Sequence, residues 1–304
     1  MGHSTTGMRQ GRLRSAWSVG LRLGRVSNLP TVWTNALVGT ALAGGAVFSA
    51  PAVLVVVALS LLYVAGMFLN DAFDRDFDAR ERPERPIPSR EVTPAVVFSA
   101  GFGLLVTALA LLMLATQGME PGARWQALSI GVALAASIVL YDAWHKGTAL
   151  SPLLMGLCRM LAYLTAGAAA NASLPAELWK AALVALSYLI GLTYVAKQET
   201  LRRVENLWPL LFLAAPFAYL PAAIGAGPVG AGVAIGLLAL VAYAVSLLLR
   251  PGRTEVRRAV VSLIAGISLV DGVLVAAHGY PLLALVAVLA FFLTLALQRH
   301  VPGT

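Results

Sequence analysis

Residues 50–78 read APAVLVVVALSLLYVAGMFLNDAFDRDFD, an apolar run followed directly by a cluster of acidic residues. The apolar part, residues 52–69, approaches the length of about 20 residues that a helix needs to cross a bilayer. The whole chain has this character, since 59% of its 304 residues are hydrophobic, 12% are charged and its mean hydropathy is +0.81. Soluble domains carry about 25% charged residues. The composition therefore predicts an integral membrane protein.

Apolar runs bounded by Pro, Gly or charged residues recur along the chain and predict ten membrane-spanning helices. They cover residues 29–49, 52–69, 93–116, 126–141, 149–170, 178–196, 207–224, 229–249, 259–277 and 280–298. We expect an all-α, polytopic bundle of nine to ten spans, built as one membrane domain over residues 29–299. A basic cytoplasmic or interfacial segment, residues 1–28, precedes it, and a short tail, residues 300–304, follows it.

The positively charged residues predict the orientation of these spans. If the N-terminus is cytoplasmic, all but three of the 22 Lys and Arg residues fall in cytoplasmic segments. The exceptions are Arg124 and Lys180, which lie outside, and Arg159, which lies within a span. Cytoplasmic loops of membrane proteins carry such an excess. We therefore expect both termini in the cytoplasm, with a bacterial cytoplasmic membrane as the location, and we attribute the net charge of +8 to topology and not to a nucleic-acid partner.

The acidic cluster after the second predicted span is the strongest candidate for a functional site. On a continuous helix, one arc of about 100° contains Asn70, Asp71, Asp74 and Asp78. Asp76 points to the opposite side. Carboxylates placed so closely repel one another unless a cation lies among them, and oxygen ligands of this kind suit Mg²⁺. The spacing and the place at a membrane boundary favour a Mg²⁺ site over a solvated acidic loop.

Residues 70–89 also resemble the first signature of the UbiA superfamily of intramembrane prenyltransferases. That signature reads NDxxDxxxD and then an RPxPSG-like element. This chain has Asn70-Asp71-x-x-Asp74-x-x-x-Asp78, followed by Arg85-Pro86-Ile87-Pro88-Ser89. Two further stretches are similar to the family: Arg25-x-x-Asn28-x-Pro30-Thr31-x-Trp33-x-Asn35 at the first span, and Tyr141 with Lys146 after the fourth. Arg90 departs from the pattern, because the family often has Gly there.

The resemblance implies a helical bundle around a central cavity that holds a polyprenyl diphosphate. In the family Mg²⁺ binds the diphosphate, and the allylic group then alkylates an acceptor, often an aromatic ring. The resemblance implies that Mg²⁺ is bound by the catalytic Asp71, Asp74 and Asp78. Asn70 would orient the diphosphate and Lys146 would contact its oxygens, the alternative for Lys146 being a topology anchor. Arg159 is a further candidate for a substrate contact, because charges inside a membrane tend to face a cavity.

The second Asp motif of the family, DxxxD after the sixth span, is absent from this chain. Residues 197–205 read KQETLRRVE, with Gln198 and Arg202 where the two Asp would fall. Lys197 and Arg202 either bind phosphate oxygens in place of a second Mg²⁺ or serve as topology anchors. Glu199 remains as one possible metal ligand. Bacterial UbiA-like proteins of the EboC type also resemble this sequence, and an incomplete second motif fits that group.

A faint internal repeat relates the two motif regions, since Leu59-Ser60 precedes Asn70-Asp71 by the same distance as Leu186-Ser187 precedes Lys197-Gln198. Loss of the second motif leaves two functions open. One is Mg²⁺-dependent transfer of a prenyl group to an unidentified acceptor within the membrane, and the other is binding or transport of an isoprenoid without catalysis.

A third class, the CDP-alcohol phosphotransferases, also places Asp at membrane edges. Its pattern fails here, because Ala72 and Arg75 follow Asp71 and Asp74 where that family needs DG and AR. Nucleotide and zinc motifs are absent as well, and the single cysteine, Cys158, excludes a thiol–metal cluster.

Overall fold

The computed structural model describes residues 17–198, 207–250 and 252–303, and every regular element in these ranges is a helix. The predicted all-α class is therefore confirmed. The elements are η1 (Val26–Asn28), α2 (Leu29–Leu42), α3 (Ala50–Phe73), α4 (Arg75–Glu81), α5 (Pro94–Ala115), α6 (Pro121–Trp144), α7 (Ser151–Ala170), α8 (Ala176–Lys197), η2 (Trp208–Tyr219), α9 (Leu220–Gly225), α10 (Pro228–Leu248), α11 (Arg253–Ala277) and α12 (Pro281–Gln298).

Within the described ranges, nine helical stretches are long and apolar enough to cross a membrane, so the protein is a multi-pass integral membrane protein. These nine coincide with nine of the ten predicted spans. The remaining one, residues 29–49, is shorter than expected, because α2 has only 14 residues. At about 1.5 Å per residue it is about 21 Å long, less than the bilayer core of about 30 Å.

A glycine pair ends α2 early. Gly44 has a positive φ of 76°, and the amide of Gly45 donates to the carbonyl oxygen of Thr40 at 2.9 Å. This is the arrangement of a Schellman-type helix end, in which a left-handed residue closes the last turn. The sixth of the nine long stretches, Trp208–Gly225, is also irregular, since Pro216 lies inside η2 and removes an amide donor. The twelve residues of η2 are consequently wound as a 3₁₀-helix.

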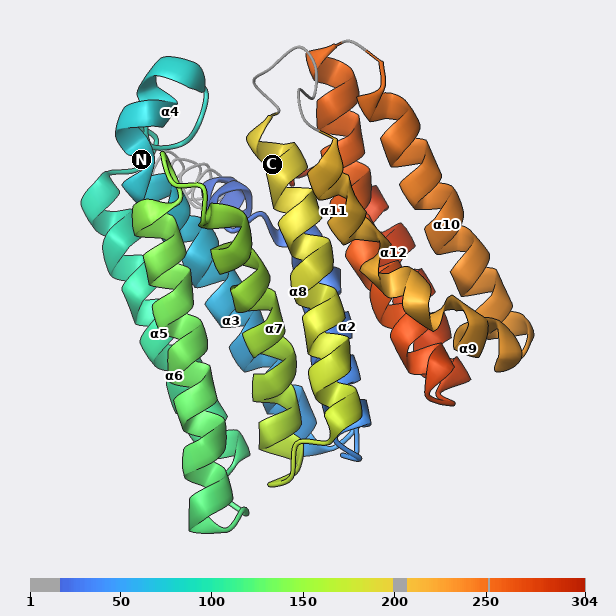
Figure 1. Ribbon diagram of the computed structural model, residues 1–304. Helices are drawn as coiled ribbons and strands as arrows, with labels where there is room; N and C mark the ends of the chain where they lie inside the picture. Colours follow the sequence, from blue (N-terminus) through green and yellow to red (C-terminus); the bar gives the residue numbers. More distant parts are fainter. Residues whose placement is uncertain (1–16, 199–206, 251, 304) are drawn as a thin grey trace, which may run out of the picture.

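The helices pack as two groups joined through the middle of the bundle. Helices α3, α5, α6 and α7 form one group, and α10, α11 and α12 form the other, with α2 and α8 between them (Figure 1). Small residues allow the close contacts. A Cβ on Gly39 of α2 would lie 2.5 Å from the carbonyl oxygen of Tyr163 on α7, so only Gly fits. Two buried apolar clusters, one for each group, surround these contacts.

One end of the bundle collects the segments that carry the sequence motifs. Helix α4 caps this end, next to the end of α3 (Figure 1). The C-terminal segment returns here, because the Asn28 side chain donates to the carbonyl oxygen of Gly303 at 3.0 Å and accepts from Gln298 at 2.9 Å. The first and last described segments thus lie at the same end of the bundle.

Candidate functional site

The predicted acidic stripe is divided between two helices. Helix α3 ends at Phe73, Asp74 has a non-helical ψ of 0°, and α4 begins at Arg75. The expectation of one continuous helical arc is therefore not met in detail, because the chain turns at Asp74. The three carboxylates nevertheless lie in the same region and are buried, with 5% exposure for Asp71, 8% for Asp74 and 1% for Asp78.

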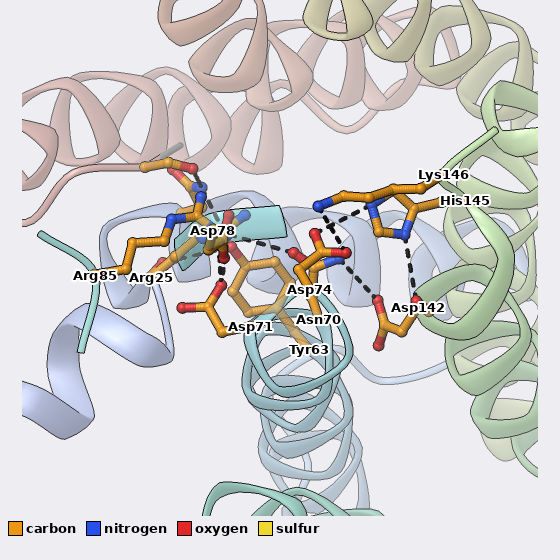
Figure 2. A network of polar contacts seen from close by, with 12 residues as sticks. Arg25, Tyr63, Asn70, Asp71, Asp74, Asp78, Arg85, Asp142, His145 and Lys146 are labelled. Atoms are coloured by element: carbon orange, nitrogen blue, oxygen red, sulfur yellow. Dashed lines mark hydrogen bonds and ion pairs between the residues drawn. The ribbon is translucent and has the colours of Figure 1, made fainter. Parts of the chain in front are cut away.

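Two arginines neutralise Asp71 and Asp78. The guanidinium of Arg25, which precedes η1, lies 3.0 Å from Oδ1 of Asp71. Arg85 bridges the two carboxylates through one nitrogen, Nη1, at 3.1 Å from Asp71 and 2.8 Å from Asp78. Figure 2 shows both arginines beside the acidic residues. Burial raises the pKa of Asp78, and the positive charge of Arg85 offsets only part of that effect.

Asp74 is paired with the segment that follows α6. Its carboxylate lies 2.9 Å from Nζ of Lys146 and 3.3 Å from Nε2 of His145. The Lys146 ammonium also lies 3.5 Å from the centre of the Phe77 ring, a cation–π contact that holds it over α4. Burial alone would raise the pKa of Asp74, but the hydrogen bonds and charges of His145 and Lys146 outweigh burial and lower this pKa.

These pairs decide how a metal ion fits. In the part of the chain that the structure describes, no group of three His, Cys, Asp or Glu side chains is arranged to hold a metal ion. The donor type fits Mg²⁺, since Asp71, Asp74 and Asp78 offer only oxygen. The position also fits, because Arg85 Nη1 lies between Asp71 and Asp78 where a cation is needed. A divalent ion held by these carboxylates requires Arg85 to turn away from them.

An apolar cavity lies directly inside the bundle from this polar end. It has a volume of about 90 Å³ and is bordered by α3, α6 and α7, with Tyr63, Met67, Tyr141, Asp142, Met155 and Arg159 in its wall. This is smaller than a cavity of about 150 Å³ that holds benzene. A long apolar chain therefore has to displace side chains, and Met67 and Met155 are flexible enough to move.

One residue pair joins the cavity to the acidic cluster. The Asn70 amide donates to Oδ1 of Asp142 at 3.3 Å, while its own Oδ1 faces Arg25 at 3.4 Å (Figure 2). Asn70 therefore lies between the acidic cluster and Asp142, which is part of the cavity wall. Asp142 is 3% exposed.

Arg159 is held in the cavity wall by a buried polar network. Its Nη1 donates to Oδ1 of Asn35, and the Asn35 amide donates to Oδ2 of Asp271 at 2.7 Å. Asp271 is fully buried and also accepts hydrogen bonds from Thr34 and Tyr163. Arg159 and Asp271, two charged residues inside the membrane-spanning helices, are thus linked through Asn35, and this network connects α2, α7 and α11.

Lys197, the remaining described candidate, lies at the end of α8. Its ammonium donates to the carbonyl oxygen of Thr148 at 2.7 Å and to Oγ of Ser151 at 2.9 Å. It therefore ties α8 to the start of α7. Glu199 and Arg202 lie outside the described residues, so the structure brings Asn70, Asp71, Asp74, Asp78 and Lys146 together and leaves these two unplaced.

Sequence reasoning missed the arginines and Asp142. Arg25 and Arg85 stand in stretches that the family pattern singled out, but their pairing with Asp71 crosses 46 and 14 residues. Asp142 stands next to Tyr141 in the stretch noted after the fourth span. Two residues so far apart in the sequence leave no periodic pattern that would reveal their ion pair. An Arg inside a motif rich in Asp is only an indirect sign of such a pair.

Comparisons with known proteins agree with this architecture. The model of the UbiA prenyltransferase family matches residues 32–260. A digeranylgeranylglyceryl phosphate synthase from Natronomonas pharaonis is 31% identical over 173 residues, which is 56% of each chain, so this match spans about half of the relative's length. A protoheme IX farnesyltransferase from Anaeromyxobacter dehalogenans is 29% identical over 70% of this chain and 78% of the relative.

A solved structure has the same fold. The apo structure of a UbiA homolog from Aeropyrum pernix superposes with a TM-score of 0.62, at 16% identity, over 83% of this chain and 96% of the homolog.

Proposed function

This chain belongs to the UbiA prenyltransferase family, and on that premise we propose that it transfers a polyprenyl group from a prenyl diphosphate to an acceptor within the membrane. The observation that carries the proposal is the junction at Asn70. On one side of it lie three buried carboxylates and their cations, and on the other side lies an apolar cavity. A prenyl diphosphate has the same division, with a charged head and an apolar tail.

The residues of the polar end would divide the work at the diphosphate. Asp71, Asp74 and Asp78 would hold Mg²⁺, which supplies positive charge to the leaving diphosphate. Arg25, Arg85 and Lys146 already lie within 3.1 Å of these carboxylates and would turn their charges to the phosphate oxygens. Arginine suits this role because its fork binds phosphate through two parallel hydrogen bonds. Arg159 would act further inside, where the prenyl group enters the cavity.

We further propose that the polar end faces the cytoplasm of a bacterial cell. The Lys and Arg distribution supports this orientation, and it places both termini on the same side as the acidic cluster. A diphosphate substrate made in the cytoplasm would then reach Asp71 and Arg85 without crossing the membrane.

A second candidate function is isoprenoid diphosphate binding without turnover. It is favoured by one observation, that the end of α8 carries Lys197 bound to Thr148 and Ser151 where the family has an Asp motif. The two functions differ in product, because only a transferase releases diphosphate and forms a prenylated acceptor.

The test compares a variant that lacks two buried carboxylates with a variant that lacks an exposed one. Asp71→Asn with Asp74→Asn removes two buried carboxylates, whereas Asp76→Asn changes a carboxylate whose side chain is 84% exposed. Binding of geranylgeranyl diphosphate is measured with and without Mg²⁺, followed by release of diphosphate with a panel of lipid acceptors. We expect the double variant to lose Mg²⁺-dependent binding by more than about 100-fold and the control to bind as the wild type does. Equal binding by the double variant and the wild type overturns the proposal.

A further inference from the structure

Helices α10, α11 and α12 border a second apolar groove, on the side of the bundle away from α5 and α6 (Figure 1). The groove has a volume of about 380 Å³ and shares no residue with the cavity beside the candidate site. Two of its residues, Tyr243 and Phe292, are 43% and 60% exposed, so the groove opens to the lipid. The rest of its wall includes Gly232, Gly236, Leu240, Leu269, Val288 and Phe291.

The shape of the groove selects a thin ligand. Helices α10 and α12 both pack against α11 and also contact each other, so the space between them is narrow. A helix of a second copy has a diameter of about 10–12 Å with its side chains, and it does not fit between two helices that touch. An extended hydrocarbon chain is thin enough to enter. The groove therefore suits the acyl chain of a lipid better than another helix.

Exposed arginines continue the helix faces that border the groove. Arg250 follows the groove residue Tyr243 by seven residues, or about two turns, and lies two residues after α10 ends. Arg258 precedes the groove residue Leu269 on α11 by eleven residues, or about three turns. Each arginine therefore lies on the same face of the chain as the groove residue, and both are exposed.

The depth of the groove matches one leaflet of a bilayer. At about 1.5 Å per residue, Arg258 lies about 16 Å from Leu269 along α11. This is about half of the 30 Å hydrocarbon core, so Arg258 reaches the headgroups when Leu269 lies near the middle of the membrane. This end of α10 and α11 is also the end of the bundle that carries α4 (Figure 1). In the proposed orientation it faces the cytoplasm, and the cytoplasmic leaflet contains the anionic lipids.

We propose that the groove binds an anionic phospholipid, whose acyl chain lies between α10 and α12 and whose phosphate is bound by Arg250 and Arg258. A guanidinium binds phosphate oxygens through two parallel hydrogen bonds, and basic residues at the membrane surface attract anionic lipids. A zwitterionic lipid carries a positive group next to its phosphate, which two arginines repel. The groove and the arginines thus select the two ends of the same molecule, and this site takes no part in the proposed reaction.

The experiment measures lipid binding to the purified, delipidated protein in detergent by native mass spectrometry. The probes are dioleoyl phosphatidylglycerol and dioleoyl phosphatidylcholine, which have identical acyl chains and differ in the net charge of the headgroup. We expect the wild type to bind phosphatidylglycerol about 25-fold more tightly, because each of the two arginines contributes about fivefold.

One double variant tests the headgroup contact. Arg250→Gln with Arg258→Gln should reduce the preference for phosphatidylglycerol to less than about threefold, while binding of phosphatidylcholine stays at the wild-type level. The matched control is Arg80→Gln with Arg90→Gln, which removes the same charge from two exposed arginines near α4. This control should keep the wild-type preference, because it leaves the groove and its arginines intact.

A second variant tests the acyl-chain contact by filling the groove. Gly236→Leu should weaken binding of both lipids by about 10-fold, since its side chain occupies the apolar space. A Cβ at Gly236 meets only Leu269, at 4.0 Å, so the substitution fits the fold, and Gly232→Leu fills the same groove with no atom within 4 Å of its Cβ. Gly103→Leu is the control, because Gly103 on α5 also has open space around it and lies away from the groove.

Several results would overturn this inference. Equal binding of the two lipids by the wild type excludes a site for anionic lipid, and so does an unchanged preference in the double arginine variant. Wild-type binding of phosphatidylglycerol by both glycine variants places the lipid elsewhere on the surface. If the wild type is instead a dimer that Gly236→Leu separates, the groove is an interface between two copies of the chain and not a lipid site.

Discussion

Helices α3 and α8 occupy corresponding positions of the faint internal repeat, but their ends at the polar face have opposite charge. The last turn of α3 carries Asn70 and Asp71, whose side chains contact Arg25 and Arg85. Helix α8 ends in Lys197, whose ammonium donates to Thr148 and Ser151. The first end is built from ion pairs whose carboxylates can instead bind a metal ion and whose arginines can instead bind a diphosphate. The second is built from hydrogen bonds that tie neighbouring helices together.

The serines of the repeat show the same divergence. Ser60 donates to the carbonyl oxygen of Val56 on its own helix at 2.7 Å and accepts from Trp33 at 3.1 Å. Ser187 donates to the carbonyl oxygen of Phe212 in η2 at 3.0 Å. The irregular η2 lies against α8, where its exposed backbone carbonyls need donors. The two serines at equivalent positions of the repeat therefore have different hydrogen-bond partners, although the residue is the same. The charged residues of the candidate site are concentrated around α3, α4 and the end of α6.

The largest effect is expected on the stability of the ion pairs at the end of α3. Arg85→Ala leaves the buried carboxylates of Asp71 and Asp78 without their shared cation. Removing one partner of a buried pair costs about 3 kcal/mol or more, so we expect the variant to be destabilised by about that amount in EDTA. Mg²⁺ should recover much of this loss, because the ion takes the place of the guanidinium between the two carboxylates.

Thermal unfolding in detergent, with EDTA or with Mg²⁺, measures this change. Arg75→Ala is the matched control, since the Arg75 side chain is 43% exposed and lies 3.7 Å from the exposed Asp76. That variant should stay within about 1 kcal/mol of the wild type. An Arg85→Ala protein whose stability is the same in EDTA and in Mg²⁺ would contradict a metal site at Asp71 and Asp78.

A smaller effect is expected on diphosphate binding when each of the two lysines is replaced. Lys146 lies 2.9 Å from Asp74 and next to the acidic cluster, whereas Lys197 is held by Thr148 and Ser151. We expect Lys146→Ala to weaken Mg²⁺-dependent binding of geranylgeranyl diphosphate by about 10-fold, the loss of one charge-assisted hydrogen bond. Lys197→Ala should weaken it by less than about threefold, and a titration of both variants measures the difference. Equal losses would restore the prediction that Lys197 also contacts the diphosphate.

The sequence predicted the membrane class, nine of the long helices and the acidic cluster, because apolar length and motif spacing are local properties. The early end of α2 was missed, because the apolar run continues to residue 49 although Gly44 and Gly45 close the helix. The pairing of Asp71 with Arg25, 46 residues earlier in the chain, was not readable, because it depends on how η1 meets α3. The same holds for Asp142, whose place in the site depends on which face of α6 borders the cavity.

The smallest effect is expected on the pH dependence of stability, which should differ between two carboxylates of the acidic cluster. The pKa of Asp74 is lowered, because the hydrogen bonds and charges of His145 and Lys146 outweigh its burial. The Asp74 carboxylate therefore stabilises the fold above its ordinary pKa of about 4. This stabilisation is lost as the pH falls through the lowered value. Burial raises the pKa of Asp78, so its contribution has the opposite sign: it is present below the ordinary pKa and is lost as the pH rises through the raised value. In EDTA, between about pH 6 and pH 3, Asp74→Asn should therefore lose less unfolding free energy on acidification than the wild type, and Asp78→Asn should lose more. If both variants follow the wild-type curve, the folded protein does not shift the pKa of Asp74 and Asp78 in opposite directions.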